Sequence, residues 1–225
     1  MPIHMTALSF PLSMILSVYA QSEATLALRP WAEAMAAFEA LDTQSSPAPG
    51  GVVFVGSSSI VRWDLPRWFG DLEGPLVNRG FGGSQIEDSA RELDLLVLRH
   101  KPRAIVFYAG DNDVAAGKSA ERVEEDFARF IDGIRAALPK TPIFFIAIKP
   151  STSRWRFEKI MRDANARIQA RCEDDPTLRY VDIWTPMLGD DGRPRAELLA
   201  EDGLHLSDEG YALWSRLVLG TLDSE

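Results

Sequence analysis

Positive charge is scarce in this sequence, and so are cysteine and histidine. Its 225 residues include 24 lysines and arginines against 33 aspartates and glutamates, a formal net charge of −9. Binding to nucleic acid or to anionic lipid generally requires a basic face, so the charge argues against both partners. The only cysteine, Cys172, excludes an intrachain disulfide. Its place within an expected helix rather than at a strand end predicts an incidental thiol.

The first twenty residues contain no Lys, Arg, Asp or Glu. From Thr6 to Ala20 they are mostly apolar and end on a small residue, as a secretory signal peptide does before its cleavage site. The run is too short and too interrupted by Ser and Pro to span a bilayer, so we expect no stable membrane insertion. The usual positive charge at the start of a signal peptide is missing. Two interpretations therefore stay open for residues 1–20: the signal peptide of an exported or periplasmic protein, or a disordered leader of a cytoplasmic one.

Short apolar runs alternate with helical patterns along the rest of the chain. Their continuous apolarity and β-branched content are typical of strands buried on both faces of a parallel sheet. The runs are Val52–Val55, Leu76–Val77, Ala104–Ala109, Ile143–Ile148 and Leu178–Ile183. The helical patterns cover residues 29–42, 85–99, 119–138, 154–173 and 207–221. This alternation predicts an α/β fold, a three-layer α/β/α sandwich with a mainly parallel sheet of about five strands, in one domain over residues 28–225.

Several well-known site motifs are absent. A phosphate loop would need a lysine and a second glycine after the first run, and no stretch matches the dinucleotide fingerprint G-x-G-x-x-G. The nucleophile motif G-x-S-x-G of the α/β-hydrolases is missing as well. In an open parallel sheet, ligands bind at the carboxyl ends of the strands. A ligand site is therefore expected among the residues that follow the apolar runs.

Two glycine-containing turns follow the first two runs. The sequence GSSS at residues 56–59 places serines at a strand-to-helix turn, where a hydroxyl can act as a nucleophile or simply cap the helix. The sequence NRGFGGS follows next, and its pair Gly82–Gly83 permits close approach of a backbone N–H to a ligand, or only a flexible turn. Neither turn is decisive alone.

Polar side chains follow the third run. In DND, residues 111–113, the amide of Asn112 offers an uncharged donor to an oxyanion, or closes an Asx turn. Asp111 and Asp113 have no further metal ligand at suitable spacing, and we expect Asp113 to be structural.

Asp202 and His205 lie three residues apart before the last helix, a spacing at which a carboxylate can orient an imidazole. His4 falls in the leader and His100 is expected to be a cation at a helix end. His205 is thus the only well-placed base.

The four blocks in this order, FVGSSSIVRW, NRGFGGS, YAGDND and DGLHLSDEGY, resemble the SGNH (GDSL) hydrolase family. The resemblance covers nearly all of residues 50–220. It implies that Ser58 is the nucleophile, that His205 and Asp202 complete a catalytic triad, and that Ser58, Gly83 and Asn112 form the oxyanion hole. The family's usual Gly-Asp-Ser reads Gly-Ser-Ser here, which leaves a question of register, because Ser57 and Ser59 flank the expected nucleophile.

The resemblance further implies a serine ester hydrolase that works through an acyl-enzyme on a small-molecule ester: small acyl esters, acetylated carbohydrates or lipids. No cofactor and no metal would be required. An acyltransferase that uses an alcohol acceptor is the alternative, and a non-catalytic binding protein is a third class. Trp63, Lys149, Arg154 and Trp155 would either line the substrate pocket or serve as packing and surface residues. Nothing in the sequence bears on the oligomeric state.

Overall fold

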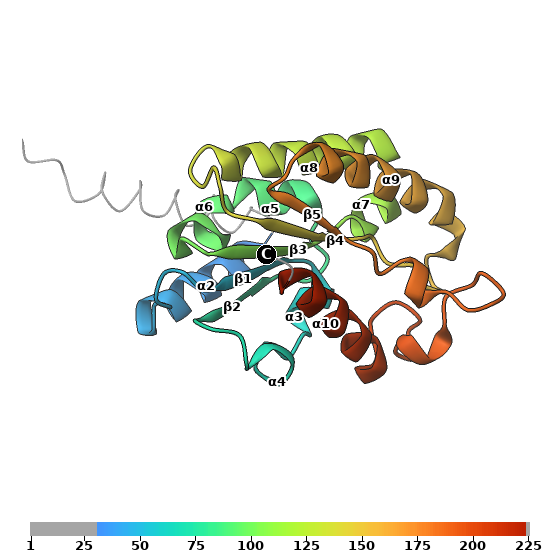
Figure 1. Cartoon of the computed structure of the whole chain (residues 1–225), viewed down its shortest axis with the longest axis horizontal. Helices are drawn as coiled ribbons and strands as arrows, with labels where there is room; N and C mark the ends of the chain where they lie inside the picture. Colours follow the sequence, from blue (N-terminus) through green and yellow to red (C-terminus); the bar gives the residue numbers. More distant parts are fainter. Residues whose placement is uncertain (1–30, 224–225) are drawn as a thin grey trace, which may run out of the picture. The chain divides into compact units, whose positions relative to one another are not determined.

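The computed structural model describes residues 31–223 (Figure 1), and the chain divides into two compact units, residues 1–44 and 45–225. The described part of the first unit is helix α2 (Ala32–Gln44), close to the helix predicted at 29–42. The expected signal peptide or leader, residues 1–20, lies outside the described residues, and the domain boundary at residue 28 stays a prediction. Within residues 31–223 no helix has both the length and the apolarity that crossing a bilayer requires.

The second unit is built on a five-stranded parallel sheet in the order β2-β1-β3-β4-β5. The strands are β1 (Val52–Gly56), β2 (Leu76–Gly80), β3 (Ala104–Tyr108), β4 (Ile143–Ile146) and β5 (Leu178–Val181). This confirms the predicted class of sheet. The chain moves outward from β1 to β2 and then in the opposite direction to β3. Strand order therefore reverses between β1 and β3, where parallel sheets of this type bind ligands.

Helices cover both faces of this sheet, as Figure 1 shows. One layer contains α5 (Ile86–Arg91), α6 (Leu93–Leu96), α8 (Ala120–Arg135) and α9 (Glu158–Asp174). The other contains α3 (Ser58–Val61), α4 (Leu65–Phe69) and α10 (Asp208–Leu222). The short helix α7 (Asp111–Ala115) follows β3. Short 3₁₀ turns complete the connections at Leu98–His100, Trp155–Phe157, Thr185–Met187 and Ala196–Leu198.

Alternate residues of each strand feed the two cores, because successive side chains point to opposite faces of a sheet. On one face Phe54 and Tyr108 pack with Trp214 of α10 in a single apolar cluster. On the other face Phe107 stacks on Phe130 of α8, with ring centroids 4.0 Å apart. Burial of each such side chain stabilises the fold by about 1.5–3 kcal/mol, which fixes the strand ends that carry the site.

Strand β2 is longer than the apolar run Leu76–Val77 predicts. It continues to Gly80 because its polar residues find partners. Asn78 donates its amide N–H to the carbonyl of Ile60 at 2.7 Å, and its own Oδ1 accepts from the N–H of Gly80 at 2.9 Å. The helix predicted over 85–99 is instead three short segments, α5, α6 and the turn at Leu98–His100.

His100 does not have the predicted role of an exposed cation. Its side chain is buried, with Nε2 3.2 Å from Nε of the equally buried Arg79 and 3.3 Å from the carbonyl oxygen of Leu95. The prediction failed because Arg79 lies in a polar stretch of β2 that the hydrophobic pattern did not identify as strand. His100 thus serves the packing of β2.

Cys172 lies buried on α9, as expected of an incidental thiol. Burial raises its pKa to about 12. At neutral pH the side chain is therefore a thiol, which is a poor nucleophile.

Candidate active site

The turn after β1 exposes one serine and buries two. Ser57 and Ser59 are each 1% exposed, whereas Ser58, the first residue of α3, is partly exposed. Ser57 donates its backbone N–H to the carbonyl of Tyr108 on β3 at 3.0 Å, which ties the turn to the neighbouring strand. Ser57 is the N-cap residue of α3, but its side chain makes no capping hydrogen bond. The local geometry thus presents the hydroxyl of Ser58.

Glycine is required where this turn leaves the sheet. Gly56 has φ +137°, and a Cβ there would lie 1.8 Å from the carbonyl oxygen of Tyr108. Gly80, at the end of β2, would place a Cβ 2.4 Å from the backbone nitrogen of Val61 in α3. These close approaches pack α3 against the ends of β1 and β2, and so fix the position of Ser58 at the switch in strand order.

The loop before α10 brings His205 to Ser58. The Nε2 of His205 lies 3.0 Å from Ser58 Oγ, and its Nδ1 lies 2.6 Å from Asp202 Oδ2. The other oxygen of Asp202 accepts the backbone N–H groups of Leu204 and His205, each at 2.9 Å. A carboxylate can only accept at Nδ1, so Nδ1 carries the proton and Nε2 can accept from the serine hydroxyl.

The carboxyl of Asp202 stays ionised far into the acid range. Its hydrogen bonds from the His205 ring and from two backbone N–H groups hold the pKa of Asp202 well below its usual value. Ser207 caps the following helix, accepting the N–H of Gly210 at 3.1 Å. A capped helix start therefore follows two residues after His205.

The turn after β2 lies against Ser58. A Cβ built on Gly82 would be 3.9 Å from the Cβ of Ser58, and the next residue, Gly83, has φ +81°, the left-handed region that favours glycine. Among residues 31–223 no acceptor pairs with the backbone N–H of Ser58 or Gly83. These two backbone N–H groups, which are predicted to donate to an oxyanion, are therefore not used in the described part of the fold.

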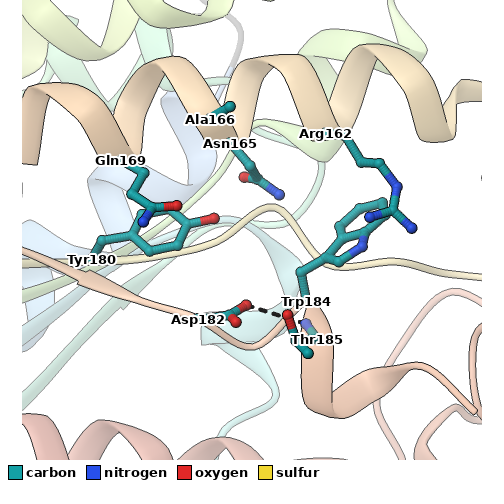
Figure 2. Close-up of a pocket in the computed structure, with 8 residues that line it drawn as sticks. All are labelled: Arg162, Asn165, Ala166, Gln169, Tyr180, Asp182, Trp184 and Thr185. Carbon is teal, nitrogen blue, oxygen red and sulfur yellow. Dashed lines mark hydrogen bonds between the residues drawn. The ribbon is translucent and has the colours of Figure 1, made fainter.

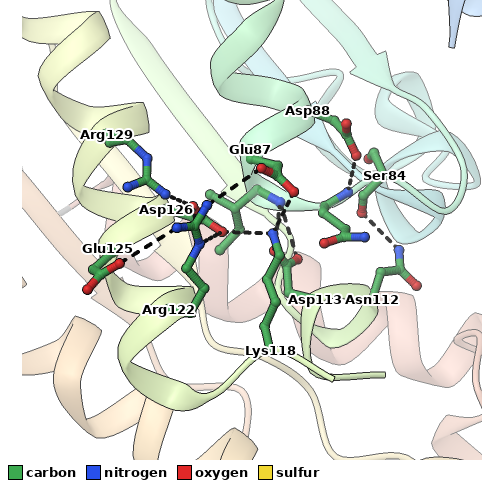
Figure 3. Close-up of polar contacts among 12 residues, drawn as sticks. Ser84, Glu87, Asp88, Asn112, Asp113, Lys118, Arg122, Glu125, Asp126 and Arg129 are labelled. Carbon is green, nitrogen blue, oxygen red and sulfur yellow. Dashed lines mark hydrogen bonds and ion pairs between the residues drawn. The ribbon is translucent and has the colours of Figure 1, made fainter. Parts of the chain in front are cut away.

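Asn112 stands at the start of α7, after the glycine turn that ends β3. Its Nδ2 donates to the carbonyl of Ser84 at 2.9 Å, as Figure 3 shows, and its Oδ1 accepts from Arg154 at 2.9 Å. Ser84 directly follows Gly83. The contact therefore links the two strand ends that carry the expected oxyanion donors, and only one of the two Nδ2 hydrogens is used.

Asp113 has the structural role expected of it. Its buried carboxylate accepts the backbone N–H of Ile86 at 3.2 Å and pairs with Lys118 at 3.0 Å. Lys118 also pairs with Glu87 and Asp126, at 3.0 and 2.7 Å (Figure 3). Burial raises the pKa of Asp113 to about 6, although Lys118 opposes this shift. The cluster joins the first turns of α5 and α7 to the middle of α8.

Two residues considered as pocket-lining are packing residues instead. Trp63 is 2% exposed and donates its indole N–H to Ser215 Oγ at 3.0 Å. Lys149 is 1% exposed, with Nζ 2.7 Å from Asp111 Oδ2 and 3.0 Å from the Tyr108 hydroxyl. Burial alone would raise the pKa of Asp111, but Lys149 and Arg154 hold it below its usual value. A charged partner thus replaces water for this buried lysine.

A cavity of about 190 Å³ lies between α9 and the segment that follows β5 (Figure 2). Its lining residues are Arg162, Asn165, Ala166, Gln169, Tyr180, Asp182, Trp184 and Thr185. None of the candidate catalytic side chains is among them. Typical ligand cavities hold about 300–1,000 Å³, so this one is small for a substrate site. Within residues 31–223 no cluster of three or more metal-ligating side chains was found.

The sequence motifs missed the partners that hold Asn112. The side chains of Asp111 and Arg154 pair with each other at 3.1 Å, and Arg154 also bonds Asn112. Trp155 stacks on Trp184, with ring centroids 6.2 Å apart, and so belongs to a packed aromatic pair. The one sequence signal for these partners is their position, because Lys149 and Arg154 follow β4, the neighbour of β3.

Comparisons with known proteins identify a family and a fold. The sequence profile of the GDSL-like lipase/acylhydrolase family matches residues 59–213, which begins just after Ser58 and includes the other four candidate residues. No curated protein matches the chain.

Solved structures share the fold at low sequence identity. A candidate platelet activating factor from Streptococcus pneumonia is 21% identical, with a TM-score of 0.76 over 92% of this chain and 99% of that one. A GDSL-like lipase from Bacteroides thetaiotaomicron is 21% identical, with a TM-score of 0.71 over 84% and 98% of the two chains. A family 3 carbohydrate esterase from Talaromyces cellulolyticus is 19% identical, with a TM-score of 0.55 over 78% and 97%.

Proposed function

The chain belongs to the GDSL-like lipase/acylhydrolase family, and from that premise we propose that it is a serine ester hydrolase that works through an acyl-enzyme on Ser58. The observation that carries the proposal is the position of His205, whose two ring nitrogens lie 3.0 Å from Ser58 Oγ and 2.6 Å from Asp202 Oδ2. This is the arrangement that lets a neutral imidazole accept a serine proton while a carboxylate stabilises the resulting imidazolium.

In the first half of the reaction, Ser58 Oγ attacks the ester carbonyl carbon as its proton passes to Nε2 of His205. The carbonyl electron pair moves to oxygen, and the N–H groups of Ser58 and Gly83 and the Nδ2 of Asn112 would donate to that oxyanion. Collapse of the intermediate breaks the bond to the alcohol, which leaves with the proton from His205. The product is an ester between the substrate's acyl group and Ser58.

In the second half, water takes the place of the alcohol. His205 removes a proton from the water as its oxygen attacks the acyl carbonyl. The second intermediate collapses to release the carboxylic acid, and Ser58 recovers its proton. No step requires an electron donor or a metal ion. If an alcohol takes the place of water, the same steps transfer the acyl group to it, and the protein is then an acyltransferase.

The acyl group and the alcohol define the substrate, for which we propose small acyl esters, acetylated carbohydrates or lipids. The similar structures include a protein named as a lipase and another named as a carbohydrate esterase. A comparison of turnover on different esters distinguishes these classes.

A screen of esters on the wild-type protein and Ser58→Ala tests the proposal. The panel contains p-nitrophenyl esters from acetate to dodecanoate and acetylated xylose and glucosamine derivatives, with and without glycerol as an acceptor. We expect hydrolysis that is lost in Ser58→Ala, and a fluorophosphonate adduct located on Ser58 by mass spectrometry. Product on glycerol that forms faster than free acid would favour the acyltransferase. Absence of both turnover and adduct would favour a binding protein.

A further inference from the structure

The side-chain amide of Asn112 is held in one orientation. Arg154 has only donors, so the atom of Asn112 that faces it must be Oδ1, at 2.9 Å. The carbonyl of Ser84 can only accept, so the atom facing it must be Nδ2, also at 2.9 Å. A flip of the amide would set donor against donor and acceptor against acceptor. Two contacts from different parts of the chain thus select the same orientation.

Arg154 is itself held by a buried group of charges. Its Nη1 lies 3.1 Å from Asp111 Oδ2, the same oxygen that pairs with Lys149 at 2.7 Å, while its Nη2 donates to Asn112. The side chain of Asp111 is 6% exposed and that of Arg154 only 17%. Because Arg154 follows β4 and Asp111 and Asn112 follow β3, the ion pair couples the ends of two neighbouring strands.

We propose that Arg154 is a positioning residue for the oxyanion hole. Arg154 orients the side chain of Asn112 and, through its charge, polarises the amide. The inference rests on the proposed function, in which Nδ2 of Asn112 donates to the oxyanion. With Oδ1 held by the guanidinium and one Nδ2 hydrogen held by Ser84, the second Nδ2 hydrogen has a fixed direction before substrate arrives. A donor fixed in advance needs no reorganisation when charge develops on the carbonyl oxygen.

The geometry favours positioning over a direct substrate contact. The guanidinium of Arg154 is already engaged in the fold: Nη2 donates to Asn112, and Nη1 is buried and forms an ion pair with Asp111, although without hydrogen-bond geometry. A planar guanidinium can hold two acceptors in a fixed fork, whereas a lysine ammonium is a single flexible point charge. Substitution by lysine therefore separates the charge of this residue from its geometry.

Three variants test the inference: Arg154→Met, Arg154→Lys, and Arg156→Met as the matched control. Arg156 is an exposed arginine on the same segment whose guanidinium packs over the Phe157 ring, 4.7 Å from its centroid. We expect kcat/KM of Arg154→Met to fall by about 10²-fold, the loss typical of a misplaced catalytic group, mostly through kcat. Arg154→Lys should recover part of the loss, and Arg156→Met should match the wild type. Thermal unfolding of each variant shows whether the fold is intact. We expect that it is, because Asp111 keeps its pair with Lys149.

A double-mutant cycle with Asn112→Ala separates positioning from other roles. If Arg154 acts through Asn112, Arg154→Met should change kcat/KM less than about 2-fold once Asn112 is absent, because the two effects are not additive. The same loss in both backgrounds would mean that Arg154 contacts substrate or supports the fold independently, and would overturn the inference.

The orientation of Asn112 can also be measured without turnover. In ¹⁵N-labelled protein, the side-chain NH₂ signal of Asn112 is assigned by its loss in Asn112→Ala. We expect a rigid amide in the wild type and in Arg156→Met, and a mobile, shifted one in Arg154→Met. An amide that stays rigid and unshifted in Arg154→Met contradicts the inference even if esters are hydrolysed. A mobile amide in a protein without esterase activity supports it while the proposed function fails.

Discussion

His205 and Ser58 are separated by 147 residues in the sequence, yet Nε2 of the one lies 3.0 Å from Oγ of the other. Ser58 begins a helix at the end of β1, and His205 lies in the loop before α10, the last helix. The packing of α10 and α3 on the same face of the sheet brings them together: the hydroxyl of Tyr211 in α10 donates to the carbonyl of Ser59 in α3 at 3.0 Å. The reactive distance is therefore a product of tertiary packing.

Substitution of each serine of the turn tests which one is the nucleophile. Ser58→Ala should lower kcat by at least about 10³-fold, because the acyl-enzyme cannot form. Ser57→Ala and Ser59→Ala should keep most of the activity, since both side chains are buried away from the imidazole. Steady-state kinetics on one p-nitrophenyl ester suffice. Full activity in Ser58→Ala, with a loss in a flanking variant, would show that the register of the motif is wrong.

Asp202 and His205 should matter more for the chemical step, measured by kcat, than for substrate binding. In Asp202→Asn the amide can present N–H to Nδ1, which favours the tautomer whose Nε2 carries the proton and cannot accept from serine. We expect kcat to fall by about 10²–10⁴-fold, with a larger loss in His205→Ala. The pH dependence of kcat/KM is the informative measurement. A variant Asp202→Asn with unchanged kcat would remove the carboxylate from the mechanism.

Removal of the Asn112 amide should slow the reaction without weakening substrate binding. Its contact to the carbonyl oxygen strengthens only as negative charge develops, so Asn112→Ala should lower kcat by about 10²–10³-fold and change KM little. Asn112→Asp is a second variant of nearly the same shape, which replaces the donor by an acceptor and should be at least as slow. A rise in KM with kcat unchanged would instead indicate a binding contact made equally in ground and transition states.

The strands and the four polar blocks could be predicted because both are local signals. Apolar runs such as Val52–Val55 and Ile143–Ile148 mark strands buried on both faces, and motif residues stand directly after β1, β2 and β3. The polar half of β2 could not be predicted, since the partners of Asn78 and Arg79 there include Ile60 and His100, which lie about 20 residues away.

The supports of the site were beyond local patterns for the same reason. Lys149 and Arg154 follow β4, and nothing in that segment indicates that their partner is the carboxylate of Asp111 after β3. From the sequence alone, an arginine beside a tryptophan, such as Arg154 beside Trp155, suggests a surface residue or a substrate contact. Only the pairing of β3 with β4 makes them neighbours of Asn112.

The buried cluster around Lys118 should give stability an unusual pH dependence. Asp113 has a pKa of about 6 in the folded protein and about 3.9 when unfolded, so between these values the folded state binds more protons than the unfolded one. Stability from this group is thus present below pH 4 and is lost as pH rises through 6, by about 3 kcal/mol in total. Asn at this position does not titrate. The unfolding free energy of the wild type minus that of Asp113→Asn should therefore decrease by about 3 kcal/mol from pH 3.5 to 7, measured by urea unfolding at each pH. Carboxylates that do not interact with Asp113 cancel in this difference, so a constant or increasing value would mean that folding does not raise the pKa of Asp113 and that Lys118 offsets the cost of burial.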